Sequence, residues 1–212
     1  LEHPTWLRAY ARATGADARI KAGEYELPPG TTPRGLVALL ESGDVVQHSV
    51  TLVEGWTFRE LRRALEQEPF LDNTLAGKDD AAVMTALGEE GQAPEGLFFP
   101  DTYLFGKGTT DLEILRASRL RMRAELESAW NGRVPDLPVT TPYEALILAS
   151  IVEKETALAA ERPRIAGVFT TRLRRGMRLQ TDPTVIYGLG PGFDGNLRRA
   201  DLQRDGPYNT YT

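Results

Sequence analysis

The sequence lacks cysteine and is poor in histidine, and both shortages exclude classes of function. With no cysteine among its 212 residues, the chain has no disulfide scaffold, thiolate nucleophile or cysteine-ligated metal centre. Its two histidines, His3 and His48, match no metal-ligand spacing, and a Ser–His–Asp triad would have to use one of them. No glycine-rich phosphate loop is present. We therefore expect carboxylate chemistry that needs no cofactor and no metal.

Long apolar runs and excess positive charge are also missing. The longest apolar stretch, residues 145–152, is interrupted by Ser150 and is far shorter than the roughly 20 residues of a membrane span. No signal peptide opens the sequence, and it starts at Leu1 rather than Met, so we expect Leu1 to be the start of a fragment or of an ordered region. The net charge of −5 and the absence of a basic stripe argue against a nucleic-acid partner.

The composition that is present predicts a soluble globular protein with α+β architecture. Hydrophobic residues make up 41% of the chain, enough for a real core. Strand-like runs at residues 23–27 and 45–53 enclose a short helix with Thr32 as its cap. We expect a strand–helix–strand subdomain over residues 1–50 and a mixed domain over residues 51–212.

The second domain should be built around a buried helix spanning residues 141–160. Thr141 and Glu144 form a capping box at its start. Residues 145–152 are apolar almost all round, which is typical of a central helix rather than a surface one.

Glu155 is the candidate catalytic residue on this helix. At about 100° per residue it lies within about 60° of Val152 and Leu158, whereas Glu153 faces the other side. A carboxyl group in an apolar stripe is costly to ionise, so we expect Glu155 to hold its proton near neutral pH, as a general acid must. The pattern leaves two alternatives open: a structural ion pair with Arg162, and a membrane or partner contact.

Two further groups of residues carry an alternative each. Asp182, followed by Pro183, is typical of a helix N-cap, and the alternative is a second active-site carboxylate. Tyr208, Asn209 and Tyr211 near the C-terminus could form a sugar-binding wall or simply a packed tail.

Several segments, in this order along the chain, resemble the endolytic murein transglycosylase family. The resemblance covers nearly the whole sequence and is most specific in the run Leu-Ala-Ser-Ile-Val-Glu-Lys-Glu-Thr at residues 148–156. The main supporting segments are Lys21–Tyr25, Glu95–Tyr103, Gly176–Tyr187 and Tyr208–Tyr211.

The resemblance implies a location, a substrate and partners. It implies a bacterial inner-membrane protein, with a single-pass anchor absent from this chain and a periplasmic or extracytoplasmic body. The first subdomain would be LysM-like. The implied activity is cleavage between N-acetylmuramic acid and N-acetylglucosamine inside nascent peptidoglycan strands, leaving a 1,6-anhydro end. Peptidoglycan is then the main partner, and peptidoglycan synthases are a further candidate.

The resemblance also places the family's catalytic glutamate on Glu155, acting first as acid and then as base. The sugar's own C6 hydroxyl is the nucleophile, so no second carboxylate is needed. The candidates to bind substrate are Gln180, Asp182, Tyr208, Asn209 and Tyr211.

One departure from the family and three rival functions stay open at this point. The Gly-Leu-Pro-Pro segment that normally follows the last tyrosine block is absent, so we expect a truncated C-terminal end and an incomplete cleft. The rivals are a hydrolase that uses Glu155 with Asp182, a non-catalytic glycan-binding module, and a scaffold of the wall-synthesis machinery.

Overall fold

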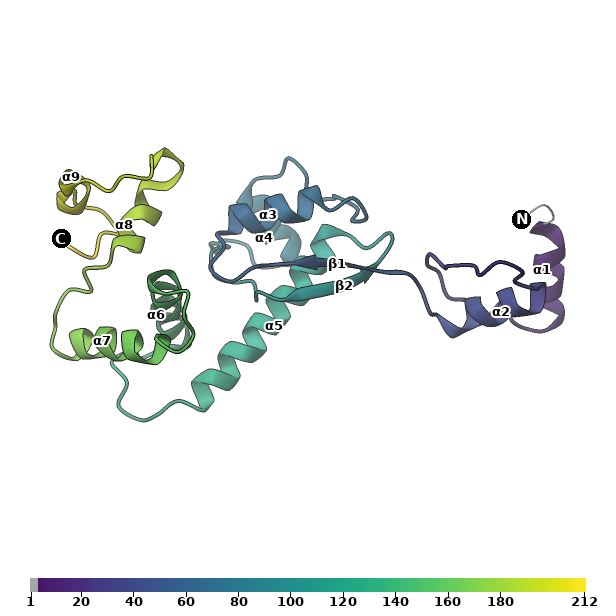
Figure 1. Ribbon diagram of the computed structural model, residues 1–212, viewed down its shortest axis with the longest axis horizontal. Helices are drawn as coiled ribbons and strands as arrows, with labels where there is room; N and C mark the ends of the chain where they lie inside the picture. Colours follow the sequence, from purple (N-terminus) through teal and green to yellow (C-terminus); the bar gives the residue numbers. More distant parts are fainter. Residues whose placement is uncertain (1–3) are drawn as a thin grey trace. The chain divides into compact units, whose positions relative to one another are not determined.

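The computed structural model describes residues 4–212 and shows an α+β protein (Figure 1). In this part of the chain, β1 (Gln47–Thr51) pairs antiparallel with β2 (Thr102–Gly106), with Val50 opposite Tyr103. The remaining regular structure is helical. The predicted α+β class is therefore confirmed. His3, which matches no metal-ligand spacing in the sequence, lies outside the described residues.

The helices begin where local capping and proline signals place them. Thr32 accepts a hydrogen bond from the backbone N–H of Gly35, and Thr141 forms the predicted capping box with Glu144. The helices are α1 (Pro4–Ala13), α2 (Pro33–Ser42), α3 (Phe58–Gln67), α4 (Asp80–Leu87), α5 (Asp111–Asn131), α6 (Pro142–Glu155), α7 (Arg162–Arg174), α8 (Asp182–Leu189) and α9 (Arg199–Gln203), with a 3-10 turn η1 (Gly190–Gly192).

The chain forms two compact units, each assembled from separate segments. The first contains the residues up to Leu52 with residues 59–93 and 100–118, and the second contains residues 53–58, 94–99 and 119–212. The predicted domain boundary between residues 50 and 51 stays a prediction. Many of the buried side chains of the first unit come from α3, the loop after it, α4 and the start of α5: Leu61, Leu65, Leu71, Leu75, Val83, Met84, Ile114 and Leu115. A separate small cluster joins Ala11 and Ala16 to Val37 of α2.

The predicted strand–helix–strand subdomain is only partly correct. Residues 23–27 form no strand, and β1 pairs with β2 instead of with this segment. A single backbone hydrogen bond links the two stretches, from Val46 N–H to the carbonyl of Glu24 at 2.7 Å. Two consecutive prolines, Pro28 and Pro29, follow the segment and supply no N–H donors to a ladder. The LysM-like character of the subdomain stays a prediction.

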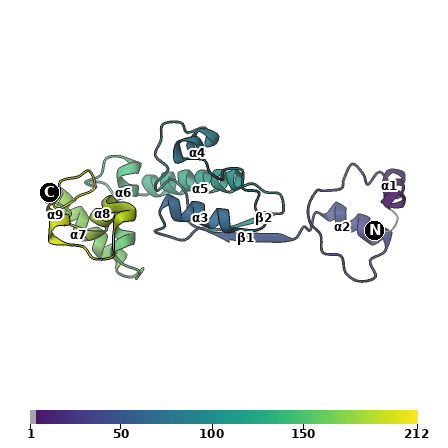
Figure 2. The same cartoon turned by 90° about the horizontal axis from the view of Figure 1, so that it is seen from above.

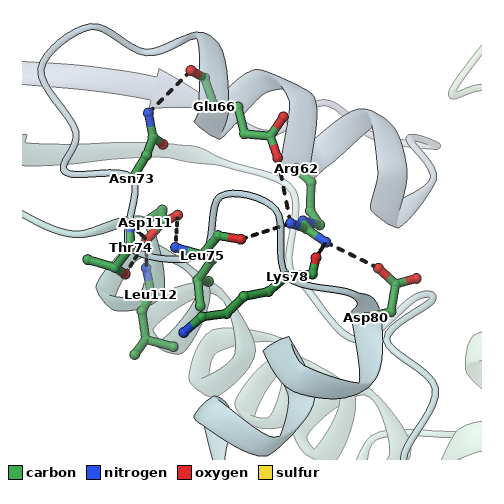
Figure 3. A network of polar contacts seen from close by, with 9 residues as sticks. All are labelled: Arg62, Glu66, Asn73, Thr74, Leu75, Lys78, Asp80, Asp111 and Leu112. Carbon is green, nitrogen blue, oxygen red and sulfur yellow. Dashed lines mark hydrogen bonds and ion pairs between the residues drawn. The ribbon is translucent and has the colours of Figure 1, made fainter.

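A buried carboxylate fixes the loop between α3 and α4 in the first unit (Figure 3). Asp111, at the start of α5, is 3% exposed. Its Oδ1 accepts hydrogen bonds from the N–H of Thr74 at 3.0 Å and from the Thr74 hydroxyl at 2.6 Å, and its Oδ2 accepts one from Leu75 N–H at 3.0 Å. Arg62 donates to the carbonyls of Leu75 and Lys78 on the same loop. The loop is thus held from α3 and from α5.

In the second unit α7 and α8 both contact α6 (Figure 2). The shared core is small: Ile151 and Val152 of α6 are buried with Phe169 of α7. The prediction of a buried central helix is wrong for most of α6, because Ile147 is 45% exposed and its neighbours are exposed or half-buried. Apolar composition predicted burial on all sides, but α7 covers only one face.

No helix in the described part of the chain combines the length and the apolar composition that crossing a bilayer requires.

Candidate functional site

Glu155 lies at the exposed C-terminal end of α6. The helix ends here, five residues before the predicted end, because Thr156 adopts an extended conformation (φ −148°, ψ 136°). The Thr156 hydroxyl donates to Glu161 at 2.8 Å and accepts from Leu158 N–H at 3.0 Å, a local arrangement that competes with another helical turn. Leu158 is therefore not on the Glu155 stripe, and the predicted apolar shielding of Glu155 is wrong.

The predicted ion pair with Arg162 forms on the other glutamate of the Glu-Lys-Glu run. Arg162 Nη2 lies 3.0 Å from Glu153 Oε1. Because the chain turns at Thr156, Arg162 does not continue the α6 surface, and the seven-residue helical spacing to Glu155 does not apply. The predicted ion pair between Glu155 and Arg162 is therefore wrong, and Arg162 forms an ion pair with Glu153 instead.

A threonine that the sequence analysis missed holds the Glu155 carboxyl. Thr181 is 2% exposed, and its hydroxyl donates to Oε1 of Glu155. Thr181, not Asp182, is the N-cap of α8, so the predicted N-cap was one residue late. A signal was present in the sequence, since threonine directly before Asp-Pro is itself a favoured N-cap.

The side chain of Asp182 does not cap α8 and instead accepts a hydrogen bond from Tyr211. The Tyr211 hydroxyl donates to Asp182 Oδ1 at 2.5 Å. This hydrogen bond, with burial and the nearby charges of Asp182 and Glu155, raises the pKa of Tyr211 to about 12, against a smaller opposing effect of Arg172. The structure therefore brings Glu155, Asp182 and Tyr211 together.

The other three predicted substrate-binding residues lie on the same segments. Gln180 is exposed and has a positive φ of 51°, an uncommon conformation for a non-glycine residue. Its neighbour Leu179 accepts a hydrogen bond from Arg172 of α7 through its carbonyl. Asn209 uses its amide within the chain, donating to backbone carbonyls that include Arg204 at 2.6 Å. Asn209 thus orders the C-terminal segment that carries Tyr211.

Tyr208, the last of the predicted residues, joins a group of exposed aromatic side chains. It packs edge-on against Tyr187 of α8, with ring centroids 4.9 Å apart. The Tyr187 hydroxyl donates to Glu95 Oε2 at 3.2 Å, and Glu95 Oε1 accepts from Phe58 N–H at 3.0 Å. Burial and the Glu95 carboxylate raise the pKa of Tyr187 to about 12. Sequence reasoning missed Tyr187 as a site residue, although Tyr187 and Glu95 both lie in segments that carry the family resemblance.

The arrangement suits acid–base chemistry on a neutral, hydroxyl-rich ligand. It offers one exposed carboxyl held at a single oxygen, a second carboxylate held by a tyrosine, and exposed aromatic faces of the kind that stack on sugar rings. Among the described residues no group of three or more histidine, aspartate or glutamate side chains is placed to hold a metal ion.

The fold and the site thus define an α+β protein with a carboxylate-centred site. The chain belongs to the YceG-like family, whose family model matches residues 1–212. It is 29% identical over 219 residues to an endolytic murein transglycosylase of Bacillus subtilis, an alignment that covers 95% of this chain and 60% of that protein. It is 30% identical over 225 residues to an endolytic murein transglycosylase of Streptococcus pneumoniae, with 91% and 40% covered.

A solved structure agrees with this assignment. The crystal structure of a YceG-like protein from Listeria monocytogenes aligns with 98% of this chain and 73% of its own, with a TM-score of 0.55 and 28% identity. The chain spans about three fifths of the Bacillus relative and two fifths of the Streptococcus relative.

Proposed function

We propose that this chain carries the catalytic site of an endolytic lytic transglycosylase acting on peptidoglycan, with Glu155 as the acid and then the base. The observation that carries the proposal is the geometry at the end of α6. Glu155 is exposed to a ligand, one of its oxygens is held by Thr181, and Asp182 and Tyr211 lie beside it. The names of the relatives support the substrate class.

In the proposed reaction the bond between N-acetylmuramic acid and N-acetylglucosamine breaks without water. Glu155 gives its proton to the glycosidic oxygen, and positive charge develops at C1 of the muramic acid. The resulting carboxylate takes the proton of the C6 hydroxyl, whose oxygen bonds to C1 and forms the 1,6-anhydro ring. The nucleophile belongs to the substrate, so proximity replaces an activated water.

The remaining predicted residues have roles that their positions support. Gln180 and Tyr208 are exposed and would contact the glycan directly. Asp182, held by Tyr211, would face the positive charge that develops at C1, and Asn209 would order the segment that carries Tyr211. We place the activity outside the cytoplasm, where peptidoglycan is assembled, and we take peptidoglycan synthases as the candidate protein partners.

The test is a comparison of two isosteric variants that differ by two positions in the same helix. Glu155→Gln should abolish cleavage of purified peptidoglycan, because the amide has no acid proton to give. Glu153→Gln should retain it, because Glu153 binds Arg162 rather than Thr181. Mass spectrometry of the products should show anhydro-muramic ends. Turnover by Glu155→Gln close to that of the unchanged chain would refute the role of Glu155.

The second carboxylate at the site favours one alternative, a hydrolase that uses Glu155 with Asp182. A hydrolase would leave reducing ends, and Asp182→Asn would then lose activity as completely as Glu155→Gln. The proposed transglycosylase should lose only part of its rate in Asp182→Asn and should still give anhydro ends.

A further inference from the structure

Thr181 uses its hydroxyl in an unusual way for its position. A threonine at a helix N-cap normally accepts a hydrogen bond from an N–H of the first turn. Thr181 is the N-cap of α8, yet no side-chain capping bond forms there. The residue is 2% exposed, and its hydroxyl donates instead to Oε1 of Glu155. The start of α8 thus forgoes a stabilising cap in favour of a contact with one carboxyl oxygen.

This contact gives the two oxygens of the Glu155 carboxyl group different surroundings. Because the hydroxyl proton of Thr181 points to Oε1, that oxygen is the acceptor, and an acid proton has its place on Oε2. We propose that Thr181 is a positioning residue that fixes Oε2 of Glu155 as the proton-carrying oxygen and keeps the carboxyl in one orientation through both proton transfers. The inference rests on the proposed role of Glu155.

The backbone around Thr181 is held so that its hydroxyl has little freedom. Its N–H donates to the hydroxyl oxygen of Thr210 at 3.0 Å, and its carbonyl accepts from the hydroxyl of Thr184 at 2.8 Å. The Thr184 and Thr210 hydroxyls are 3.0 Å apart, and Gln180 N–H donates to the Thr210 carbonyl at 3.1 Å. A β-branched side chain has few χ1 choices. Three threonines therefore tie α8 to the C-terminal segment and aim one hydroxyl at Glu155.

Other charged and titratable groups lie near this contact. Asp182 and Tyr211 are bonded to each other, and Arg172 of α7 donates to the Leu179 carbonyl. These hydrogen bonds do not use the Thr181 side chain, so we expect a change in the titration of Glu155 to report the lost hydroxyl.

The experiment compares Thr181→Val, which removes the hydroxyl at nearly constant volume, with Thr181→Ser, which restores it. Thr181→Val should lower kcat by about tenfold to a hundredfold with KM nearly unchanged, the loss expected for one hydrogen bond to a charged group. The alkaline limb of its rate profile, where the acid loses its proton, should move to higher pH, because the hydroxyl favours the charged carboxylate. Thr181→Ser should recover most of both. Thr171→Val, an exposed threonine of α7, is the matched control.

A second readout does not depend on activity. The side-chain carboxyl resonance of Glu155, followed by NMR across pH, should titrate at a higher midpoint in Thr181→Val than in the unchanged chain, and Thr181→Ser should return it. Equal midpoints in all three proteins, or equal losses of kcat in Val and Ser with an unmoved pH profile, would overturn the positioning role. Reducing ends in the products of the unchanged chain would instead refute the proposed function, and the titration would still decide the role of Thr181.

Discussion

Replacing Asp111 by asparagine should destabilise the first unit strongly, although the two side chains have nearly the same shape. The two carboxylate oxygens of Asp111 accept hydrogen bonds from two neighbouring residues of the loop between α3 and α4, Thr74 and Leu75 (Figure 3). Oδ2 accepts only the buried N–H of Leu75, and Oδ1 accepts the N–H and hydroxyl of Thr74 and the N–H of Leu112. The amide of asparagine has one oxygen, so it can replace only one of the two carboxylate oxygens as a hydrogen-bond acceptor.

The size of the effect follows from what the amide leaves unpaired. With its oxygen toward Thr74, the amide turns its own N–H groups to the buried N–H of Leu75, which loses its acceptor at a cost of about 1–3 kcal/mol. The bonds to Thr74 lose the strengthening that a charge gives, about 1 kcal/mol in total because Thr74 is exposed. The free energy of unfolding should therefore fall by about 2–4 kcal/mol.

The assay is urea unfolding followed by circular dichroism, where the midpoint should fall and the slope should stay the same. Asp80→Asn is the matched control. Asp80 belongs to the same network, but its side chain is 61% exposed and lies 3.5 Å from Arg62. Its loss should cost less than about 1 kcal/mol. If Asp111→Asn proves no more costly than Asp80→Asn, the buried hydrogen bonds of Asp111 do not hold this loop.

Two further predictions test the second unit. The pKa values of Tyr187 and Tyr211 are raised from 10.0 to about 12, so their contribution to folding stability is complete below pH 10 and is lost as the pH rises through about 12. Tyr187→Phe and Tyr211→Phe should each flatten the fall of the unfolding free energy in this range, and an unchanged fall in both would contradict the assignment. Thr141→Ala removes the capping box of α6 and should cost about 1 kcal/mol in denaturant unfolding. Thr141→Ser should restore it, and equal stability of the three proteins would show that the cap contributes nothing.

Local signals predicted much of the helical structure but not the strand pairing. The capping box at Thr141 and the cap at Thr32 place the starts of α6 and α2, because the bonds involved lie within three residues. The pairing of β1 with β2 joins residues more than fifty positions apart, and no local pattern shows such a partner. Residues 23–27 alternate like a strand, yet they remain irregular because the partner that β1 takes is elsewhere.

The site was predicted in part, and the predicted burial of Glu155 was wrong. The helical-wheel prediction extended α6 past Thr156. In the structure the helix ends at Glu155, and the Thr156 hydroxyl donates to Glu161. Burial of Glu155 followed from that extension and is not observed. The resemblance to the family selected Glu155 independently, so its candidacy does not rest on burial. Thr181 could not be found as a partner of Glu155 from the sequence, since their contact depends on how α8 meets α6.

The hydrogen bonds hold the two neighbouring carboxyl groups of the site in the same way, by one oxygen each. Tyr211, with its pKa raised to about 12, stays protonated at neutral pH and donates its hydroxyl proton to Asp182 Oδ1. Glu155 has one oxygen held by a hydroxyl and the other available for a proton. Each carboxyl group therefore keeps one oxygen available, so the choice of Glu155 as the acid rests on the family resemblance and is tested by comparing Glu155→Gln with Asp182→Asn.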